Sequence, residues 1–386
     1  MSNHAFFNAA TSEMMRSIPN LKWSRYPDDI IPMWIAAPDF PIAPEIKHAL
    51  QDAIMAQNLY YNSDQKARMA MAEKIRKVNK IPVETDNVMV IQGVDPSIWL
   101  GAKFALRSGD EVIISDPSYH TFKVVLPAVD AKPVSWVLDW DTEYYFDEEA
   151  LKEVITPRTK LIYLCNPHNP TGRVMTMKEL KAVADVAVDN KINVMVDELW
   201  EDIVFDNRKH ISIASLSPEV SDLTLTSWGF SKTFGVAGLQ IGYMASTNKE
   251  MMKEIRSYST GIQRGSSTLA CAAALVMLSE KMDYWRKGIM DHLHRVRGIC
   301  ASRLNAIPGV RFPHLEGTYV PFPKFELGLN SDELRDYLLK EAKVAFSSGS
   351  GYGVEGEGHL RVNIATSEAL MKEAMDRVEA ALTKLK

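Results

Sequence analysis

Short apolar runs alternate with longer stretches of helical spacing through the middle of the chain. Five runs rich in Val, Ile, Leu and Thr end in polar or Gly/Pro residues, and they predict buried strands at 88–91, 111–115, 160–165, 193–197 and 223–227. Between them, segments such as 96–106 and 177–189 have the spacing of helices. This alternation predicts an α/β fold in which helices cover both faces of a mainly parallel sheet.

The last quarter of the chain has a different pattern. We expect helices at 281–304, 331–341 and 367–385, and short strands at 310–312, 317–321 and 360–364. The sequence therefore predicts three parts: an N-terminal arm (1–45), a large domain (46–280) and a smaller α+β domain (281–386). The arm carries six prolines, and we expect it to run over the surface and join the small domain or a partner subunit.

Composition narrows the possible classes of protein. The 386 residues are 46% apolar and 24% charged, which is typical of a globular chain and excludes disorder. Lys and Arg number 44 against 49 Asp and Glu, so the net charge of −5 does not favour a nucleic-acid partner. No apolar stretch approaches the roughly 20 residues of a membrane helix. The N-terminal residues lack the charged region followed by an apolar run that is typical of a secretory signal. We expect a cytoplasmic protein without a membrane partner.

Cysteine and histidine give no metal or disulfide signal. Cys165, Cys271 and Cys300 form no CxxC pair. The histidines at 120, 168, 292 and 294 have no acidic partners at the spacing of metal ligands, so we interpret them as structural or solvated. We predict no metal site.

Polar motifs follow the predicted strands, where parallel sheets place their ligands. Lys232 lies in TSWGFSKTFGVAG (226–238), and a lysine whose pKa is lowered by burial becomes a nucleophile that forms Schiff bases. Asn169 lies in NPHNPTG (166–172), whose prolines and glycine fix a tight path. Asp197 ends the strand 193–197, and because an unpaired buried acid is costly, it predicts a cationic partner. Taken singly, these features also fit a surface lysine, an ordinary loop and a helix N-cap.

A fourth motif, GVDPSI at 93–98, connects a strand to a helix and offers backbone N–H groups to a phosphate. Taken as a set, NPHNPTG, Asp197, SKTF at 231–234 and Arg361 resemble the fold-type-I pyridoxal-phosphate enzymes, the aminotransferase class I/II superfamily. The resemblance runs from about Pro32 to the C-terminus. Five segments look like the cystathionine β-lyase-like subgroup: PMWIA (32–36), GVDPSI, SKTFGVAGLQ (231–240), EGTY (316–319) and LRVNIAT (360–366).

The resemblance implies a transferase-like fold with a seven-stranded sheet, pyridoxal 5′-phosphate as cofactor, an amino-acid substrate and a homodimer with shared active sites. Lys232 would form the Schiff base with the cofactor and move the proton between Cα and the cofactor C4′. Asp197 would pair with the pyridinium nitrogen and keep the ring an electron sink. Tyr119 would stack on the ring, and Asn169 would bond its phenolic oxygen.

The remaining roles concern the phosphate and the substrate. The resemblance implies that the phosphate is held by the backbone N–H groups of Val94 and Asp95, the Ser231 hydroxyl and a Tyr61 that reaches across from the other subunit. Arg361 would bind the substrate α-carboxylate through two parallel N–H···O hydrogen bonds, a bidentate geometry that lysine cannot form. Ala36, Asn169, Asp95 and Trp200 complete the predicted substrate site.

Three positions depart from the family pattern. Gln240 follows Lys232 by eight residues, where many aminotransferases have an arginine on the phosphate. Trp200 stands where transaminases commonly carry a tyrosine, and Asp95 stands where the lyase-like members carry an apolar residue. We still expect Gln240 and Trp200 at the cofactor. Asp95 either caps the following helix, with Pro96 at its first position, or joins Trp200 in facing a cationic substrate side chain.

These features predict an aminotransferase that exchanges an amino acid and a 2-oxo acid through Lys232. A C–S β-lyase that releases pyruvate, ammonia and a thiol is an alternative, because both reactions use the same lysine, acid and arginine. A specialised reaction on a basic amino acid such as arginine, either cyclisation or oxidation, is a third possibility. A regulatory module that only binds the cofactor is disfavoured, because Lys232 is present.

Overall fold

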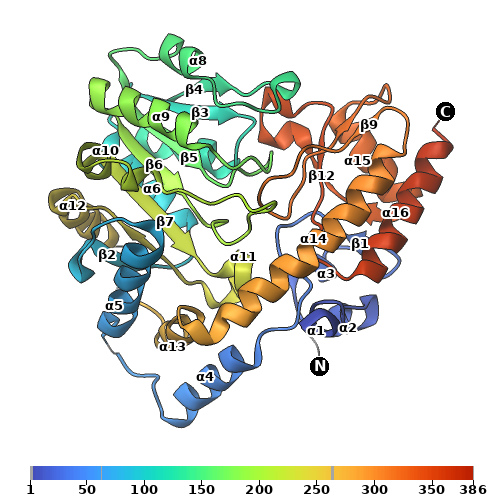
Figure 1. The fold of residues 1–386 in the computed structure, drawn as a ribbon, viewed down its shortest axis with the longest axis horizontal. Helices are drawn as coiled ribbons and strands as arrows, with labels where there is room; N and C mark the ends of the chain where they lie inside the picture. Colours follow the sequence, from blue (N-terminus) through green and yellow to red (C-terminus); the bar gives the residue numbers. More distant parts are fainter. Residues whose placement is uncertain (1–2, 62, 262–264, 386) are drawn as a thin grey trace.

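The computed structural model describes residues 3–61, 63–261 and 265–385, and its centre is a seven-stranded sheet (Figure 1). The spatial order of the strands is β2-β8-β7-β6-β5-β3-β4. In chain order they are β2 (Val88–Ile91), β3 (Glu111–Asp116), β4 (Lys132–Val137), β5 (Thr159–Cys165), β6 (Asn193–Asp197), β7 (Thr224–Gly229) and β8 (Gly242–Ala245). Strand β8 is antiparallel to both neighbours and the other pairs are parallel, so the predicted α/β class with a mainly parallel sheet is confirmed.

All five predicted strands of this sheet are present within two residues of their expected ends, and two further strands were missed. Strand β4 lies at the sheet edge and is largely exposed, so it lacks the apolar run of a buried strand. Strand β8 begins at Gly242, a residue that weakens a strand pattern. A Cβ at Gly242 would lie 2.8 Å from the carbonyl oxygen of Gly93, so close packing against the turn after β2 requires glycine there.

Alternate residues of the central strands face opposite layers of the core, as the two-residue repeat of a strand requires. Leu161, Tyr163 and Met195 belong to the apolar cluster that includes helix α6 (Asp95–Ala105). Ile162 and Val194 belong to a second cluster with helix α9 (Met177–Asn190). Both predicted helices are therefore present, and they cover opposite faces of the sheet (Figure 1).

The other helices before residue 280 are short or lie at the periphery. They are α1 (Asn3–Phe7), α2 (Ser12–Ser17), α3 (Leu21–Ser24), α4 (Pro44–Met55), α5 (Gln65–Lys74), α7 (Thr121–Val124), α8 (Glu148–Glu153), α10 (Pro218–Leu223), α11 (Ser231–Phe234), α12 (Lys249–Ser259) and α13 (Thr268–Met277). Within the described ranges, no helix combines the length and apolarity that crossing a membrane demands.

The C-terminal part contains three long helices and short strand pairs. The helices are α14 (Asp283–Asn305), α15 (Ser331–Glu341) and α16 (Glu368–Thr383), close to their expected bounds. The strands are β9 (Val310–Arg311), β10 (Lys324–Phe325), β11 (Val344–Ala345), β12 (Ser347–Ser348) and β13 (Leu360–Arg361). The predicted strand at 317–321 is wrong beyond an isolated bridge at Gly317, because the Gly317 and Thr318 N–H groups donate to the carbonyls of Gly172 and Ile203 in two separate loops.

The N-terminal arm lies against this C-terminal part (Figure 1). Strand β1 (Ile31–Pro32) pairs with β11, and Phe7 contacts Trp285 of α14 with ring centroids 4.8 Å apart. A buried ion pair also fixes the arm: Lys22 Nζ lies 2.8 Å from Asp39 Oδ2, and the Trp23 indole donates to Asp39 Oδ1. These contacts attach the N-terminal segment to the C-terminal part, while the division into an arm and two domains, with boundaries at 45 and 280, remains a prediction.

The Lys22–Asp39 pair gives a stability prediction. Asp39→Ala leaves a buried ammonium without its counter-ion, with only the Ala37 carbonyl as acceptor at 3.1 Å, and the Trp23 indole without its acceptor, and we expect the free energy of unfolding to fall by about 3–5 kcal/mol. Asp28→Ala is the matched control, because Asp28 pairs with Arg16 but is 95% exposed and should change stability by less than about 1 kcal/mol. Urea unfolding followed by circular dichroism measures both, and equal losses would contradict the assignment.

Candidate active site

The segments that follow β3, β5, β6 and β7 meet at the carboxyl edge of the sheet and form one cavity of about 340 Å³. Parallel neighbours carry their loops to the same edge, so residues far apart in the chain converge there. Eight of the residues predicted from the sequence line this cavity: Ala36, Asp95, Tyr119, Asn169, Asp197, Trp200, Lys232 and Arg361.

Lys232 lies on the short helix α11, directly after β7. Its Nζ donates to the carbonyl oxygen of Ala36 at 2.8 Å and lies 5.3 Å from the centroid of the Trp200 ring. Burial and, after it, the positive charge of Arg361 together lower the pKa of Lys232 to about 8. A substantial share of this amine is therefore neutral, and nucleophilic, at physiological pH.

Asp197 is the last residue of β6, and its carboxylate is buried. Burial raises its pKa to about 7, against the effect of the Leu199 N–H, which donates to Oδ1 at 2.9 Å. Among the described residues, no lysine, arginine or histidine nitrogen lies within 4.0 Å of this carboxylate, so this part of the chain does not supply the expected cationic partner. A cationic ring nitrogen bound in the cavity would supply it.

Arg361, on β13, is held at the other side of the cavity. Its Nη1 donates to Asn169 Oδ1 at 3.0 Å, and its Nη2 donates to the carbonyl of Trp34 at 3.1 Å. The guanidinium carbon lies 5.0 Å from the centroid of the Tyr352 ring. Its buried Nε has no acceptor among the described residues.

Asp95 begins helix α6, but it does not cap it. The N-cap residue is Val94, no side chain makes a capping hydrogen bond there, and Asp95 Oδ1 instead accepts from the Tyr119 hydroxyl at 3.2 Å. The capping interpretation is therefore wrong. The positive φ of Gly93, +80°, lets the chain turn from β2 into α6. Pro96 has no N–H and the Ser97 N–H donates to the Val94 carbonyl at 2.9 Å, so Val94 and Asp95 supply the N–H groups that this turn presents.

Four predicted residues do not line the cavity. Val94 and Ser231 are the chain neighbours of Asp95 and Lys232, so they stay next to the site without lining it. Gln240 is exposed and donates to the Ala237 carbonyl at 3.3 Å. Tyr61 is fully exposed to solvent in the single chain. The cofactor roles given to these four residues remain predictions.

Several lining residues gave no signal in the sequence. Trp34, Ser347 and Tyr352 come from the N- and C-terminal segments, and only the tertiary structure brings them to the sheet edge. His120, interpreted above as structural or solvated, also lines the cavity. Burial lowers its pKa and Arg361 adds to the effect, so His120 is neutral at physiological pH.

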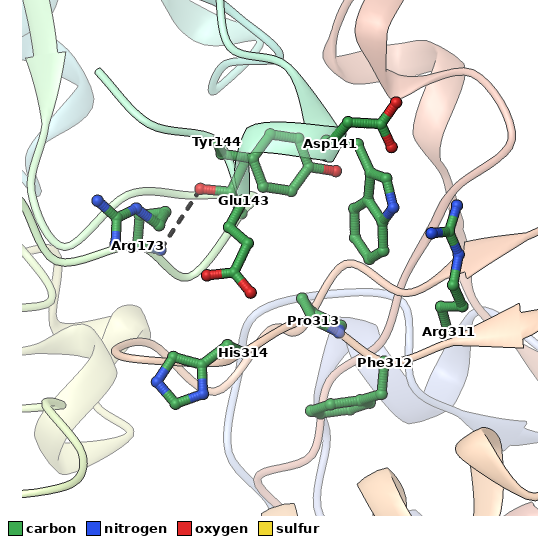
Figure 2. Close-up of a pocket in the computed structure, with 10 residues that line it drawn as sticks. Asp141, Glu143, Tyr144, Arg173, Arg311, Phe312, Pro313 and His314 are labelled. Carbon is green, nitrogen blue, oxygen red and sulfur yellow. Dashed lines mark hydrogen bonds between the residues drawn. The ribbon is translucent and has the colours of Figure 1, made fainter. Parts of the chain in front are cut away.

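Two other features lie outside this cavity. A hollow of about 240 Å³ lies between segments 140–144 and 311–314 (Figure 2), and the guanidinium of Arg173, which borders it, is paired with Glu179 and Glu316. It contains none of the predicted residues. Glu198, Glu201 and His210 place ligand atoms within 4.8 Å of one another, a group that the sequence analysis missed. Lys74 and Asn79 already bind Glu201, and His210 lies 3.0 Å from Glu198, so an ion-pair network accounts for this cluster.

The residues present fit pyridoxal phosphate. Asp197 is a buried acid without a cationic partner, Lys232 is an amine with a lowered pKa, and the start of α6 offers backbone N–H groups to a phosphate. Asn169 lines the same cavity. Its Oδ1 accepts a hydrogen bond from Arg361, and its amide nitrogen can donate to an oxygen of the cofactor.

Known proteins resemble this chain along nearly its whole length. A relative from Pyrococcus abyssi (strain GE5 / Orsay), named aspartate aminotransferase, is 31% identical, and the match covers 93% of each chain. The crystal structure of a PLP-bound putative aminotransferase from Clostridium difficile 630 matches with a TM-score of 0.89 and 27% identity, covering 94% of this chain and 96% of that one.

A putative PLP-dependent β-cystathionase from Corynebacterium diphtheriae also matches with a TM-score of 0.89, at 25% identity, covering 97% of this chain and 98% of that one. The superfamily expected from the motifs is thereby supported, whereas the lyase-like subgroup is not singled out. The sequence profile described as aminotransferase class I and II matches residues 28–378. This chain belongs to the aminotransferase class I and II family.

Proposed function

We propose that this protein is a pyridoxal-phosphate-dependent aminotransferase that moves the amino group of an L-amino acid to a 2-oxo acid. The observation that carries the proposal is the placement of Lys232, Asp197 and Arg361 in one cavity, where burial lowers the pKa of the Lys232 amine and Asp197 is a buried acid without an ion-pair partner among the described residues. Family membership and the aminotransferase names of relatives such as the Pyrococcus abyssi protein agree with it.

The cofactor would be held by the groups described above. When bound, pyridoxal phosphate supplies a carbonyl for the amino group and an electron-accepting ring. We propose that Asp197 pairs with the ring nitrogen, that Tyr119 covers one ring face and that Asn169 and Trp200 border the phenolic oxygen. The phosphate would rest at the start of α6, next to Val94 and Asp95, with Ser231 beside it. Gln240 would approach the phosphate only if its exposed side chain changes rotamer.

The chain's own residues then position and deprotonate the substrate. Arg361 binds the α-carboxylate, and its hydrogen bonds to Asn169 and to the Trp34 carbonyl fix the plane of the guanidinium. A fixed carboxylate fixes the direction of the Cα–H bond, which lowers the entropy cost of reaction. Lys232 Nζ, released from the Ala36 carbonyl, takes the proton from Cα as a general base.

A C–S β-lyase is the second candidate, and the likeness of five sequence segments to the cystathionine β-lyase-like subgroup supports it. The matching β-cystathionase structure from Corynebacterium diphtheriae agrees with that likeness. Both reactions begin with loss of the Cα proton to Lys232. They diverge according to whether a leaving group stands at Cβ.

The deciding experiment uses the cofactor-loaded enzyme, a panel of L-amino acids and no 2-oxo acid. We expect one equivalent of 2-oxo acid per active site, no ammonia, and turnover only after an acceptor such as 2-oxoglutarate is added. Mass spectrometry of the 2-oxo acid and an ammonia assay measure the two products. Continuous release of ammonia and pyruvate from cystathionine would replace the aminotransferase by the lyase.

The pKa of Lys232 gives a second test. A lysine reacts with acetic anhydride only when neutral, so labelling of Lys232 in cofactor-free protein should reach half of its high-pH plateau near pH 8 and fall as the pH drops. Lys77 is the control, because its pairing with Glu73 raises its pKa above the ordinary lysine value, and less than about 1% of its plateau is expected at pH 8. Peptide mass spectrometry measures both.

Added pyridoxal phosphate should protect Lys232 and leave Lys77 unprotected. If Lys232 were labelled only at the pH where Lys77 reacts, or if the cofactor protected neither, then Lys232 would not be the Schiff-base lysine.

We also propose that the enzyme is a homodimer in which Tyr61 reaches the other subunit's phosphate. The support is an apolar segment at the end of α4 that a single chain leaves in water: Met55, Leu59, Tyr60 and Tyr61 are 82%, 61%, 76% and 105% exposed. Contiguous apolar surface of this kind marks an interaction site.

The dimer proposal predicts a mass of twice one chain by light scattering coupled to gel filtration. Tyr61→Phe should keep that mass but weaken cofactor binding by about 10-fold, because one hydrogen bond to a charged phosphate is lost. Tyr60→Phe is the matched control and should bind the cofactor normally. A monomer, or equal cofactor affinity for both variants, would contradict the shared site.

A further inference from the structure

We propose that Asp95 selects the substrate by its side chain, and that this site takes L-amino acids with a cationic side chain, an amine or a guanidinium. The proposal rests on the proposed function, since it names the substrate class of the same cavity. It differs from what the name of the Pyrococcus abyssi relative would suggest, which is an acidic amino acid.

The first support is the place of the Asp95 carboxylate. It lines the cavity together with Arg361 and Lys232, and its only hydrogen-bond partner in the described part of the chain is the Tyr119 hydroxyl. No lysine, arginine or histidine nitrogen of the described residues lies within 4.0 Å of it. Asp95 is thus an anion in a binding cavity that has a neutral neighbour and no counter-ion.

The second support is the balance of charge around the cavity. Its described cations are Arg361 and Lys232, and the reaction already uses both, the first for the α-carboxylate and the second for the Cα proton. His120 is neutral because burial lowers its pKa. A second carboxylate on the substrate would find no free cation and would meet Asp95, whereas a substrate cation would pair with it.

The third support is the aromatic surface of the cavity. Trp200 lies beneath the Lys232 ammonium at 5.3 Å, and Tyr352 lies beside the Arg361 guanidinium at 5.0 Å. These rings therefore already contact cations, and the Tyr119 hydroxyl donates to Asp95. Since the cofactor would cover the Tyr119 ring and border Trp200, Tyr352 is the ring that remains for an aliphatic chain ending in a cation at the Asp95 carboxylate.

Asp95 could instead serve only to orient Tyr119. The two roles differ in one variant: Tyr119→Phe removes the hydrogen bond but leaves the carboxylate in place. If Asp95 binds the substrate cation, Tyr119→Phe changes the rate with all amino acids while the preference for basic over neutral side chains persists. If Asp95 only orients Tyr119, Tyr119→Phe and Asp95→Asn have the same effect on every substrate.

The main experiment measures binding without chemistry. Isothermal titration calorimetry of the cofactor-loaded protein compares 5-guanidinopentanoate, hexanoate and hexanedioate, which carry a carboxylate for Arg361 and end in a cation, a methyl group and an anion; the guanidinium stays protonated and cannot form an imine with the cofactor. We expect 5-guanidinopentanoate to bind at least about 10-fold more tightly than either of the others, the usual gain from a charge-assisted hydrogen bond. Asp95→Asn should reduce this preference to about 2-fold or less.

Asp185→Asn is the matched control. Asp185 lies exposed on α9, outside the cavity, so this variant makes the same change in net charge and should keep the wild-type preference. A kinetic arm compares kcat/KM for L-lysine and L-arginine with L-norleucine and L-glutamate. The ratio of basic to neutral substrate should fall about 10- to 100-fold in Asp95→Asn.

The outcomes separate the two proposals. If hexanedioate or L-glutamate is preferred by the unaltered protein, or if Asp95→Asn leaves the preference intact, the assignment of Asp95 is overturned. The wild-type ligand series decides this even if the variant fails to fold. If 5-guanidinopentanoate is preferred but no amino acid yields a 2-oxo acid, the aminotransferase proposal fails while the assignment of Asp95 stands.

Discussion

Removal of Lys232 and Asp197 from water at one edge of a parallel sheet is the constraint on which the site depends. Burial favours the neutral form of each group, so it brings the pKa of the amine down to about 8 and that of the acid up to about 7. An amine with this pKa is partly neutral at physiological pH and can take up a proton, whereas a buried acid is returned to its ionised form by a cation bound beside it. Either group on the protein surface would have an ordinary pKa, and the lysine would be a poor nucleophile.

The cavity that keeps Lys232 and Asp197 from water is enclosed by segments that lie far apart in the chain. Four strands bring their carboxyl ends together, but they leave one side of the cavity open, and the N- and C-terminal segments close it. Arg361 connects these parts through its hydrogen bonds to Asn169 in the loop after β5 and to the Trp34 carbonyl in the arm. Asn363 Nδ2 adds bonds to the carbonyls of Ile35 and Ala37. The Lys22–Asp39 pair then holds this stretch of the arm in place.

Asp95 shows how one residue can change the preference of a shared scaffold. The cavity supplies groups that suit any amino acid: a base for Cα, a guanidinium for the α-carboxylate and an acid for the cofactor ring. None of these discriminates between side chains. A carboxylate without a counter-ion beside them does, because the free energy of placing a charged side chain next to it depends on the sign of that charge. Relatives that share the general groups can therefore differ in substrate.

Much of this protein could be predicted from the sequence by itself. Apolar runs at 160–165 and 193–197 become β5 and β6 because a strand buried on both faces needs nothing but apolar side chains. Lys232, Asn169 and Asp197 could be found because the polar residue after a parallel strand points to the ligand edge. Strands β4 and β8 could not, because one is an exposed edge and the other is selected for close packing at Gly242. Trp34, His120 and Tyr352 could be identified as lining residues only from the tertiary structure. The tertiary structure also shows that Asp95 lines the cavity and does not cap α6. Local sequence determines the pattern of burial, whereas contacts between segments far apart in the chain decide which polar groups share one desolvated space.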